Sequence, residues 1–156
     1  MSDDIIKIDF PVIPVAKARP RIGKNGAYTP KKTFNYEMQL ALYARRAMSK
    51  SQPLRCPLRV TLKFYVPIPM SKPKIWQRFA HEQDIYPTGK PDIDNYQKAL
   101  IDACNGIVWE DDALITDCIV SKRYRYEGGI EMTVEPLRSL LHTITAKVLR
   151  VLKGVK

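Results

Sequence analysis

Alternation of apolar and polar residues predicts four strands in this 156-residue chain. Ile6, Ile8 and Phe10 alternate with charged residues, as expected of a strand with one buried face. The same period-two pattern recurs three times further along the chain. The predicted strands cover residues 6–10, 58–66, 118–126 and 130–134. Gly128 and Gly129 separate the last two strands, which indicates a hairpin.

Helical periodicity over residues 33–49 predicts a helix with two apolar sides. Phe34, Met38 and Leu42 fall on one side of the helical wheel. The other side carries Tyr36, Leu40, Tyr43 and Ala47. A helix that is apolar on two sides is buried between two surfaces. The second surface is either a partner subunit or another part of the same fold.

An N-cap at Asp92 starts a further predicted helix, over residues 93–104. Its apolar residues share one side and predict a buried face. That face comprises Ile93, Tyr96, Leu100, Ala103 and Cys104. Asp94, Lys98 and Asp102 follow one another at intervals of four and form an exposed stripe on the opposite side.

The length of the chain predicts one domain with a sizeable core, over residues 1–137. A short helix is expected near residues 76–80, in the connection that leads to the acidic stretch. Residues 138–156 carry five cations, no acid and an apolar pattern of helical period, which predicts a separate basic amphipathic helix. This C-terminal helix is expected to dock on the body or on a neighbouring subunit. Contact with DNA is the main alternative, and membrane binding is the least favoured.

The formal net charge of +10 indicates a polyanionic partner, with nucleic acid favoured over an anionic membrane. Between the first strand and the first helix, six cations occur without an acid among prolines and glycines, which predicts an extended or looped basic arm. A solvated loop is the alternative interpretation. The predicted nucleic-acid contacts of this arm are Lys17, Arg19, Arg21, Lys24, Lys31 and Lys32.

Several classes of protein are disfavoured by what the sequence lacks. It has no apolar run of membrane-spanning or signal length, so a cytoplasmic protein without membrane contact is expected. Cys56, Cys104 and Cys118 lack the spacing of a zinc site and are predicted to be reduced core thiols. Two histidines are too few for a His-based metal site. No small-molecule cofactor is expected, and a metal would need oxygen ligands.

Seven of the sixteen acids lie within 26 residues of this basic chain. Like charges this close raise one another's pKa values unless a cation intervenes. Mg²⁺ prefers oxygen ligands and keeps several waters, so two or three carboxylates plus a substrate phosphate suffice. Asp92 and Asp94 bracket a helix start, and Asp112 lies at a turn before a strand. These three residues are the predicted ligands of Mg²⁺, with Mn²⁺ as an alternative ion.

Each of these residues also has a purely structural interpretation. Asp92 alone fits an N-cap, Asp94 a favourable charge at a helix N-terminus, and the 111–112 pair a turn. Lys98 lies on the same stripe as Asp94 and is predicted to stabilise transition-state charge. In the competing interpretation its ammonium makes helical ion pairs with Asp94 and Asp102.

The residues around the acids resemble the RusA family of crossover junction endodeoxyribonucleases, which resolve Holliday junctions and are common in prophages. The matching segments are residues 90–99 (KPDIDNYQKA), 102–103 (DA) and 106–112 (GIVWEDD), Lys122, and upstream residues 14–21 (PVAKARPR) and 28–30 (YTP). The likeness covers roughly residues 10–135. It leaves the C-terminal basic helix outside.

The resemblance implies an α+β fold in which helices pack on a small mixed sheet, and a homodimer that introduces paired nicks across a four-way DNA junction. It implies that Asp92, Asp94 and Asp112 bind Mg²⁺ and that Lys98 is the catalytic lysine. Asp111 is a further candidate ligand beside them.

Lys90 and Lys122 in the matched segments join the predicted nucleic-acid contacts. Two alternatives remain at the level of the sequence. One is a catalytically silent DNA-binding module whose acids are caps, and the other is a phage nuclease that acts on flaps or other branched DNA.

Overall fold

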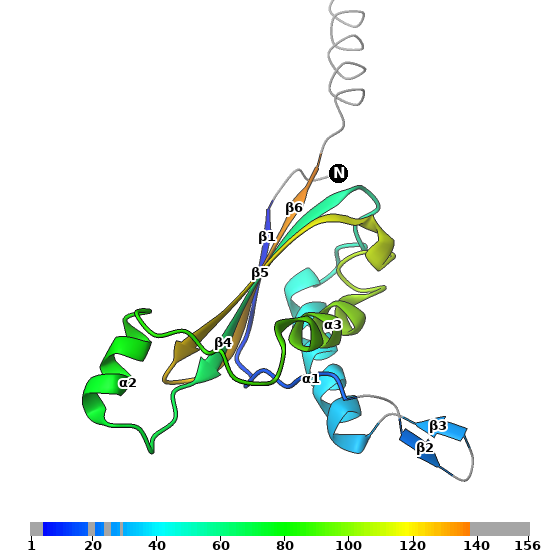
Figure 1. Cartoon of the computed structure of the whole chain (residues 1–156). Coiled ribbons are helices and arrows are strands. Elements are labelled where there is room, and N and C mark those ends of the chain that lie inside the picture. Colours follow the sequence, from blue (N-terminus) through cyan, green and yellow to red (C-terminus); the bar gives the residue numbers. More distant parts are fainter. Residues whose placement is uncertain (1–4, 19–20, 24–25, 29, 138–156) are drawn as a thin grey trace, which may run out of the picture.

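A computed structural model describes residues 5–18, 21–23, 26–28 and 30–137 of the chain (Figure 1). The predicted C-terminal helix over residues 138–156 lies outside the described residues. The elements in chain order are β1 (Ile6–Phe10), β2 (Arg21–Gly23), β3 (Gly26–Tyr28), α1 (Lys31–Met48), β4 (Leu58–Pro67), α2 (Lys74–His81), α3 (Ile93–Cys104), the 3₁₀ turn η1 (Asp112–Leu114), β5 (Ile115–Arg125) and β6 (Gly129–Pro136). The prediction of an α+β fold is confirmed.

The main sheet is mixed and has the strand order β1-β6-β4-β5. β6 pairs antiparallel with both β1 and β4, whereas β4 and β5 run parallel. A parallel pair needs a long crossover between its strands, and here that crossover contains α2 and α3. It also contains most of the acidic stretch, so the crossover places these acids beside the sheet.

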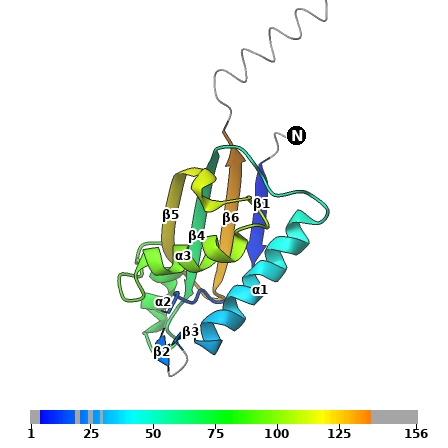
Figure 2. The same ribbon diagram turned by 90° about the vertical axis from the view of Figure 1, so that its right-hand side faces the viewer.

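Helices α1 and α3 cover one face of the sheet, as Figure 2 shows. This face carries the inward residues of β4, including Leu62 and Phe64, which are fully buried. The ring of Phe64 stacks on Tyr96 of α3 with 5.5 Å between centroids. Within the described part of the chain, no helix covers the opposite face, where charged side chains such as Arg59 reach solvent. The fold therefore has one core, and α3 is anchored to it.

The four strand predictions are confirmed, with β5 beginning three residues earlier than expected. The hairpin predicted for the last two strands is wrong, because β4 lies between β5 and β6 in the sheet and pairs with both. The basic arm was predicted to be extended or looped, but it contains the two-stranded hairpin β2–β3. Strands of three residues are too short to show a period-two pattern, which explains why the sequence did not reveal them. Within the described residues, no helix combines the length and apolarity needed to cross a bilayer.

Helix α1 buries only one of its two apolar sides. Tyr36 and Leu40 are buried against the core, whereas Phe34, Met38 and Leu42 are about half exposed at 54%, 57% and 48%. In the ranges that the structure describes, no other segment of the chain buries this second side. This second side is therefore exposed in the described part of the chain, and its burial by a partner subunit stays a prediction.

Two burial predictions are wrong. Ile93 was placed on the buried face of α3, but it lies in the first turn and is exposed, because the sheet does not extend under that end of the helix. Cys118 was predicted to be a core thiol, but it is exposed because β5 is an edge strand that α3 covers only in part. Cys104 is buried as predicted, and burial raises the pKa of its thiol to about 12.

Candidate active site

The first turn of α3 presents two carboxylates to solvent. Asp92 occupies the N-cap position, but its side chain makes no capping hydrogen bond, so the capping interaction expected from the sequence is absent. Its carbonyl oxygen accepts from the backbone N–H of Asn95 at 3.2 Å. Asp94 accepts one hydrogen bond, from the side-chain amide of Asn95 at 3.3 Å. Both carboxylates are therefore available to a ligand.

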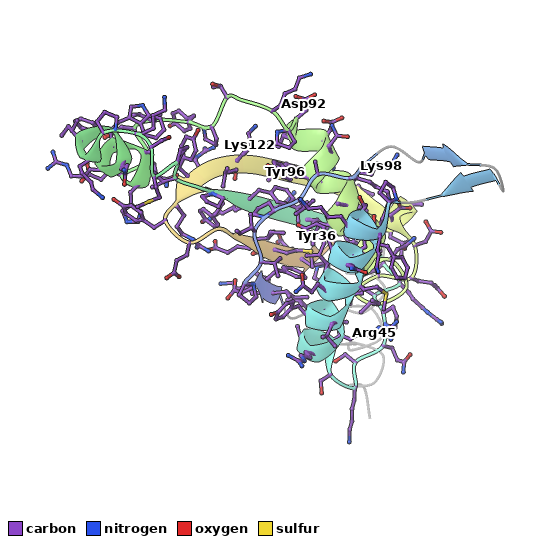
Figure 3. All side chains as sticks on the ribbon, turned by 90° about the horizontal axis from the view of Figure 1, so that it is seen from below. Tyr36, Arg45, Asp92, Tyr96, Lys98 and Lys122 are labelled. Atoms are coloured by element: carbon purple, nitrogen blue, oxygen red, sulfur yellow. The ribbon has the colours of Figure 1, made fainter. Side chains whose placement is uncertain are left out.

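Lys98 lies one turn further along α3 and is exposed (Figure 3). Among the described residues, it makes no ion pair, either with Asp94 or with Asp102. The competing interpretation, in which Lys98 is held between these two acids, is wrong. Its ammonium is free to reach a phosphate at the start of the same helix.

Asp102 is held by a lysine from a distant part of the chain. Lys17 follows β1, and its ammonium pairs with the carboxylate of Asp102 on α3 and lies 3.0 Å from Glu37 on α1. The backbone N–H of Lys17 also donates to the carbonyl of Asn95 at 3.0 Å. These three side chains are partly buried, and Lys17, which was predicted to contact DNA, joins the base of the basic arm to both helices.

Replacing Lys17 with Met is expected to lower the free energy of unfolding by about 1–3 kcal/mol, because two partly buried carboxylates lose their partner. Burial disfavours the charge of Lys17, but its bonds to Asp102 and Glu37 outweigh this effect and raise its pKa. A raised pKa stabilises the fold at neutral pH, and the contribution disappears as the pH rises beyond about 10.

Urea unfolding at pH 7 and pH 11 measures this effect. The difference between the parent and Lys17→Met is expected to shrink at the higher pH. Lys63→Met, which removes an exposed lysine of β4, is the matched control and is expected to change stability by less than about 0.5 kcal/mol. Equal effects of the two substitutions would show that the ion pairs of Lys17 contribute nothing.

The two neighbouring acids before β5 have different environments. Asp111 is the N-cap of η1, and its carboxylate accepts from the backbone N–H of Ala113 at 2.8 Å. Asp112 is exposed and has no hydrogen-bond or ion-pair partner among the described side chains. The fully buried Trp109 anchors the preceding segment in the core. Within this motif, Trp109 is the anchor, Asp111 is the cap, and Asp112 keeps an available carboxylate.

The remaining acids of the cluster are also paired. Glu110 lies 3.2 Å from the guanidinium of Arg55, and Asp117 accepts two hydrogen bonds from Arg59 at 3.0 and 3.1 Å. Four of the seven acids thus have a cation or a backbone N–H as partner. The three without one, in the part of the chain that the structure describes, are the predicted metal ligands Asp92, Asp94 and Asp112.

Lys122 holds the loop that precedes Asp92. Its ammonium donates to the carbonyls of Gly89 at 2.8 Å and Pro91 at 3.0 Å. Lys122 belongs to β5, so its contacts fasten the loop before α3 to this strand (Figure 3). It was predicted to contact DNA, and in the structure its donors are directed at the protein backbone. A role in positioning Asp92 could not have been read from the sequence, because the two residues are 30 positions apart.

A second contact holds α3 beside β5. The side-chain amide of Gln97 donates to the sulfur of Cys118 at 3.4 Å. Gln97 lies one turn after Asp94, and Cys118 lies six residues after Asp112. The first two turns of α3 therefore lie beside the middle of β5, whereas Asp112 lies further back along the chain, in η1 before that strand.

The donors fit a hard divalent cation, since all three are carboxylates and are accessible to solvent. As they stand, however, no three acidic, histidine or cysteine side chains among the described residues are grouped closely enough to hold an ion. Mg²⁺ keeps several waters and binds through one or two carboxylates plus substrate phosphates, so a preformed protein cage is not required. Asp92 and Asp94 share one helix start, whereas Asp112 begins η1, the turn that precedes β5.

The other predicted DNA contacts divide by position. Lys31 and Lys32 are exposed in the first turn of α1, and Lys90 is exposed two residues before Asp92. Arg19 and Lys24 lie outside the described residues, and only the backbone of Arg21 is described, in β2. These three described cations all precede the acidic stretch in the sequence.

Comparison with known proteins gives two matches. A family model described as "Endodeoxyribonuclease RusA" matches residues 11–135. This range includes every element from β2 to β5 and nearly all of β6. A Bacillus subtilis (strain 168) protein named "Uncharacterized protein YqaN" is 33% identical over 137 residues. That alignment covers 84% of this chain and 96% of the relative.

Proposed function

Since the chain belongs to the RusA family of endodeoxyribonucleases, we propose that it is a Mg²⁺-dependent enzyme that resolves four-way DNA junctions by paired nicks. The observation that carries the proposal is the division of the acidic cluster. Four acids have a cation or a backbone N–H as partner, and the three that have neither among the described residues are Asp92, Asp94 and Asp112. An aspartate that served only as a helix cap would accept a hydrogen bond from a backbone N–H with its carboxylate, and the carboxylate of Asp92 accepts none. This argues against the catalytically silent module.

Asp92, Asp94 and Asp112 would hold the metal. Bound there, Mg²⁺ would polarise the scissile phosphate and neutralise charge on the leaving 3′ oxygen. The bonds from Lys122 to the 89–91 loop fix where Asp92 starts α3, and the cap at Asp111 fixes the turn that carries Asp112. The chain's own contribution is therefore to set the direction from which each carboxylate approaches.

Lys98 supplies a cation at the same helix start. Its ammonium has no protein partner in the described residues, so binding a phosphate does not require an existing ion pair to break. A cation placed where negative charge increases in the transition state stabilises that state more than the ground state. We assign to Lys98 the stabilisation of charge on the transferred phosphate.

A homodimer would supply the two active sites that paired nicks require. The exposed apolar side of α1, formed by Phe34, Met38 and Leu42, supports this part of the proposal, because such a stripe is unusual on a monomer. Arg45 and Arg46 continue the exposed surface in the last turn of α1. A dimer formed through this helix would bury the apolar side that the described part of each chain leaves exposed.

Cleavage of a four-way junction, a flap and a linear duplex of equal length, each titrated with Mg²⁺, tests the proposal. We expect cleavage of the junction with a saturable dependence on Mg²⁺, and none in EDTA. A supercoiled plasmid with an extruded cruciform tests the pairing, since coordinated nicks give a linear product and single nicks give a nicked circle. A folded protein that binds the junction and cuts none of the substrates would overturn the proposal, and preferential flap cleavage would favour the other branched-DNA nuclease.

A further inference from the structure

The outward face of α2 combines apolar and cationic side chains. Ile75 and Phe79 are 53% and 39% exposed, and Lys74 and Arg78 alternate with them around the same side of the helix. The guanidinium of Arg78 lies 5.6 Å from the centre of the Phe79 ring and 3.7 Å from Glu82. In Figure 1, α2 lies at one end of the sheet, away from α1 and α3.

The fold does not need these outward side chains. The inner side of α2 already has its contacts, because Ala80 is fully buried and Trp76 packs edge-on against Tyr124 of β5 at 5.5 Å. Gln77 is buried too, and its side-chain amide donates to the carbonyl of Lys72 at 2.7 Å. Ile75 and Phe79 are thus apolar residues at positions where an eight-residue helix would be equally stable with polar ones.

The α2 lobe, residues 68–90, is fastened to the end of β5. Tyr124 accepts a hydrogen bond from Gln83 at 3.0 Å, and the ring of Tyr126 lies 4.7 Å from that of His81. The backbone N–H of Ile68 donates to the carbonyl of Arg125 at 3.1 Å. The lobe ends where Lys122 holds the loop before Asp92. Its outward face is therefore held in a fixed relation to the candidate active site.

The chemistry of this face fits DNA at a branch point. In a continuous duplex the faces of the bases are covered by stacking, and a protein mainly meets phosphates. At a branch, bases lose a stacking neighbour and expose an apolar face. Aromatic and aliphatic side chains contact such faces, and nearby cations contact the adjoining phosphates. Lys72 and Lys74 supply cations that have no acidic partner among the described residues, so the charge of the face is also complementary.

We propose that Ile75 and Phe79 contact unstacked bases at the branch point of the DNA and thereby make binding selective for branched over linear DNA. The inference deepens the proposed function and rests on it for the identity of the substrate. It predicts that selectivity resides in the α2 lobe, and that the carboxylates of the active site do not contribute to it.

The test compares binding of a four-way junction and of a linear duplex of the same length, in EDTA, by fluorescence anisotropy. The double substitution Ile75→Ser/Phe79→Ser is expected to weaken junction binding at least tenfold and to leave duplex binding within about twofold. A 2-aminopurine base at the branch point should brighten on binding the parent and not on binding the double variant. Both positions are exposed, so circular dichroism and the melting temperature should be unchanged.

Ile119→Ser is the matched control, because Ile119 is an equally exposed aliphatic residue, at 56%, on the uncovered face of the sheet. It is expected to bind both DNAs as the parent does. Equal junction-to-duplex selectivity in the parent and the double variant would overturn the inference, as would the same loss in the control. Binding in EDTA separates this test from the proposed function: a parent that selects junctions and never cuts them refutes the enzyme and leaves the lobe's role standing.

Discussion

Asp112→Asn is expected to abolish DNA cleavage, with a loss of at least about 10³-fold in the rate at saturating junction. The substitution keeps the shape of the side chain and removes the negative charge that a hard cation requires. Because Asp112 has no partner among the described residues, the fold loses no interaction, and the melting temperature should stay within about 2 °C of the parent. Single-turnover cleavage with a Mg²⁺ titration measures the loss, and anisotropy in EDTA should show unchanged junction binding.

The neighbouring residue Asp111 provides a matched control, because replacing it with asparagine also removes one carboxylate charge. Asp111→Asn also removes one negative charge, but an asparagine is as good an N-cap as an aspartate. Its side-chain oxygen can still accept from the backbone N–H of Ala113. We expect this variant to keep cleavage within about tenfold of the parent. An equally severe loss would make Asp111 a metal ligand and would mean that its capping bond is exchanged for the ion.

The acidic residues show how far the sequence could predict the site. The sequence analysis chose Asp92, Asp94 and Asp112 as metal ligands from seven acids, and the structure gives Asp102 and Asp117, which were not chosen, a cationic partner each. The partners themselves could not be predicted. Lys17 is 85 positions from Asp102, and no local rule connects an arm before the first helix with the last turn of a later one. An ion pair between residues so far apart in the sequence forms only when the helices have packed on the sheet.

The same limit explains the errors in the fold. The helical period correctly placed Ile93 on the inner side of α3. Burial also requires a packing partner beneath that turn of the helix, which the period does not predict. The pattern of α1 was interpreted correctly as apolar on two sides, whereas the pattern does not show what covers the second side. The hairpin in the basic arm was missed because glycine and proline indicated turns, and strands of three residues between turns leave no period to detect.

Lys122 illustrates a different kind of limit. Its place in the segments that resemble the RusA family predicted a nucleic-acid contact. In the structure, two backbone carbonyls of the loop before Asp92 occupy its donors, so its charge supports the geometry of an acidic residue. The high net charge therefore overstates the surface offered to DNA, since Lys17 and Lys122 are both engaged within the protein.

Lys98→Ala is expected to slow cleavage by about 10²–10³-fold while junction affinity stays within about threefold. Lys98 is exposed and unpaired in the described part of the chain, so its removal should not change the melting temperature. A lysine that acts only as charge on the transition state lowers the rate at saturation without changing the Kd of the DNA. Single-turnover rates and equilibrium binding, measured on the same junction, separate these two effects.

Lys90→Ala is the matched control for this prediction, because Lys90 is an exposed lysine on the loop before the same helix. Its removal is expected to weaken junction and duplex binding alike and to reduce the salt dependence of binding by about one counterion, with a normal rate at saturation. If Lys98→Ala behaved in the same way, the ammonium of Lys98 would be an ordinary phosphate contact. The stabilisation of the transition state would then have to come from the carboxylate-bound metal alone.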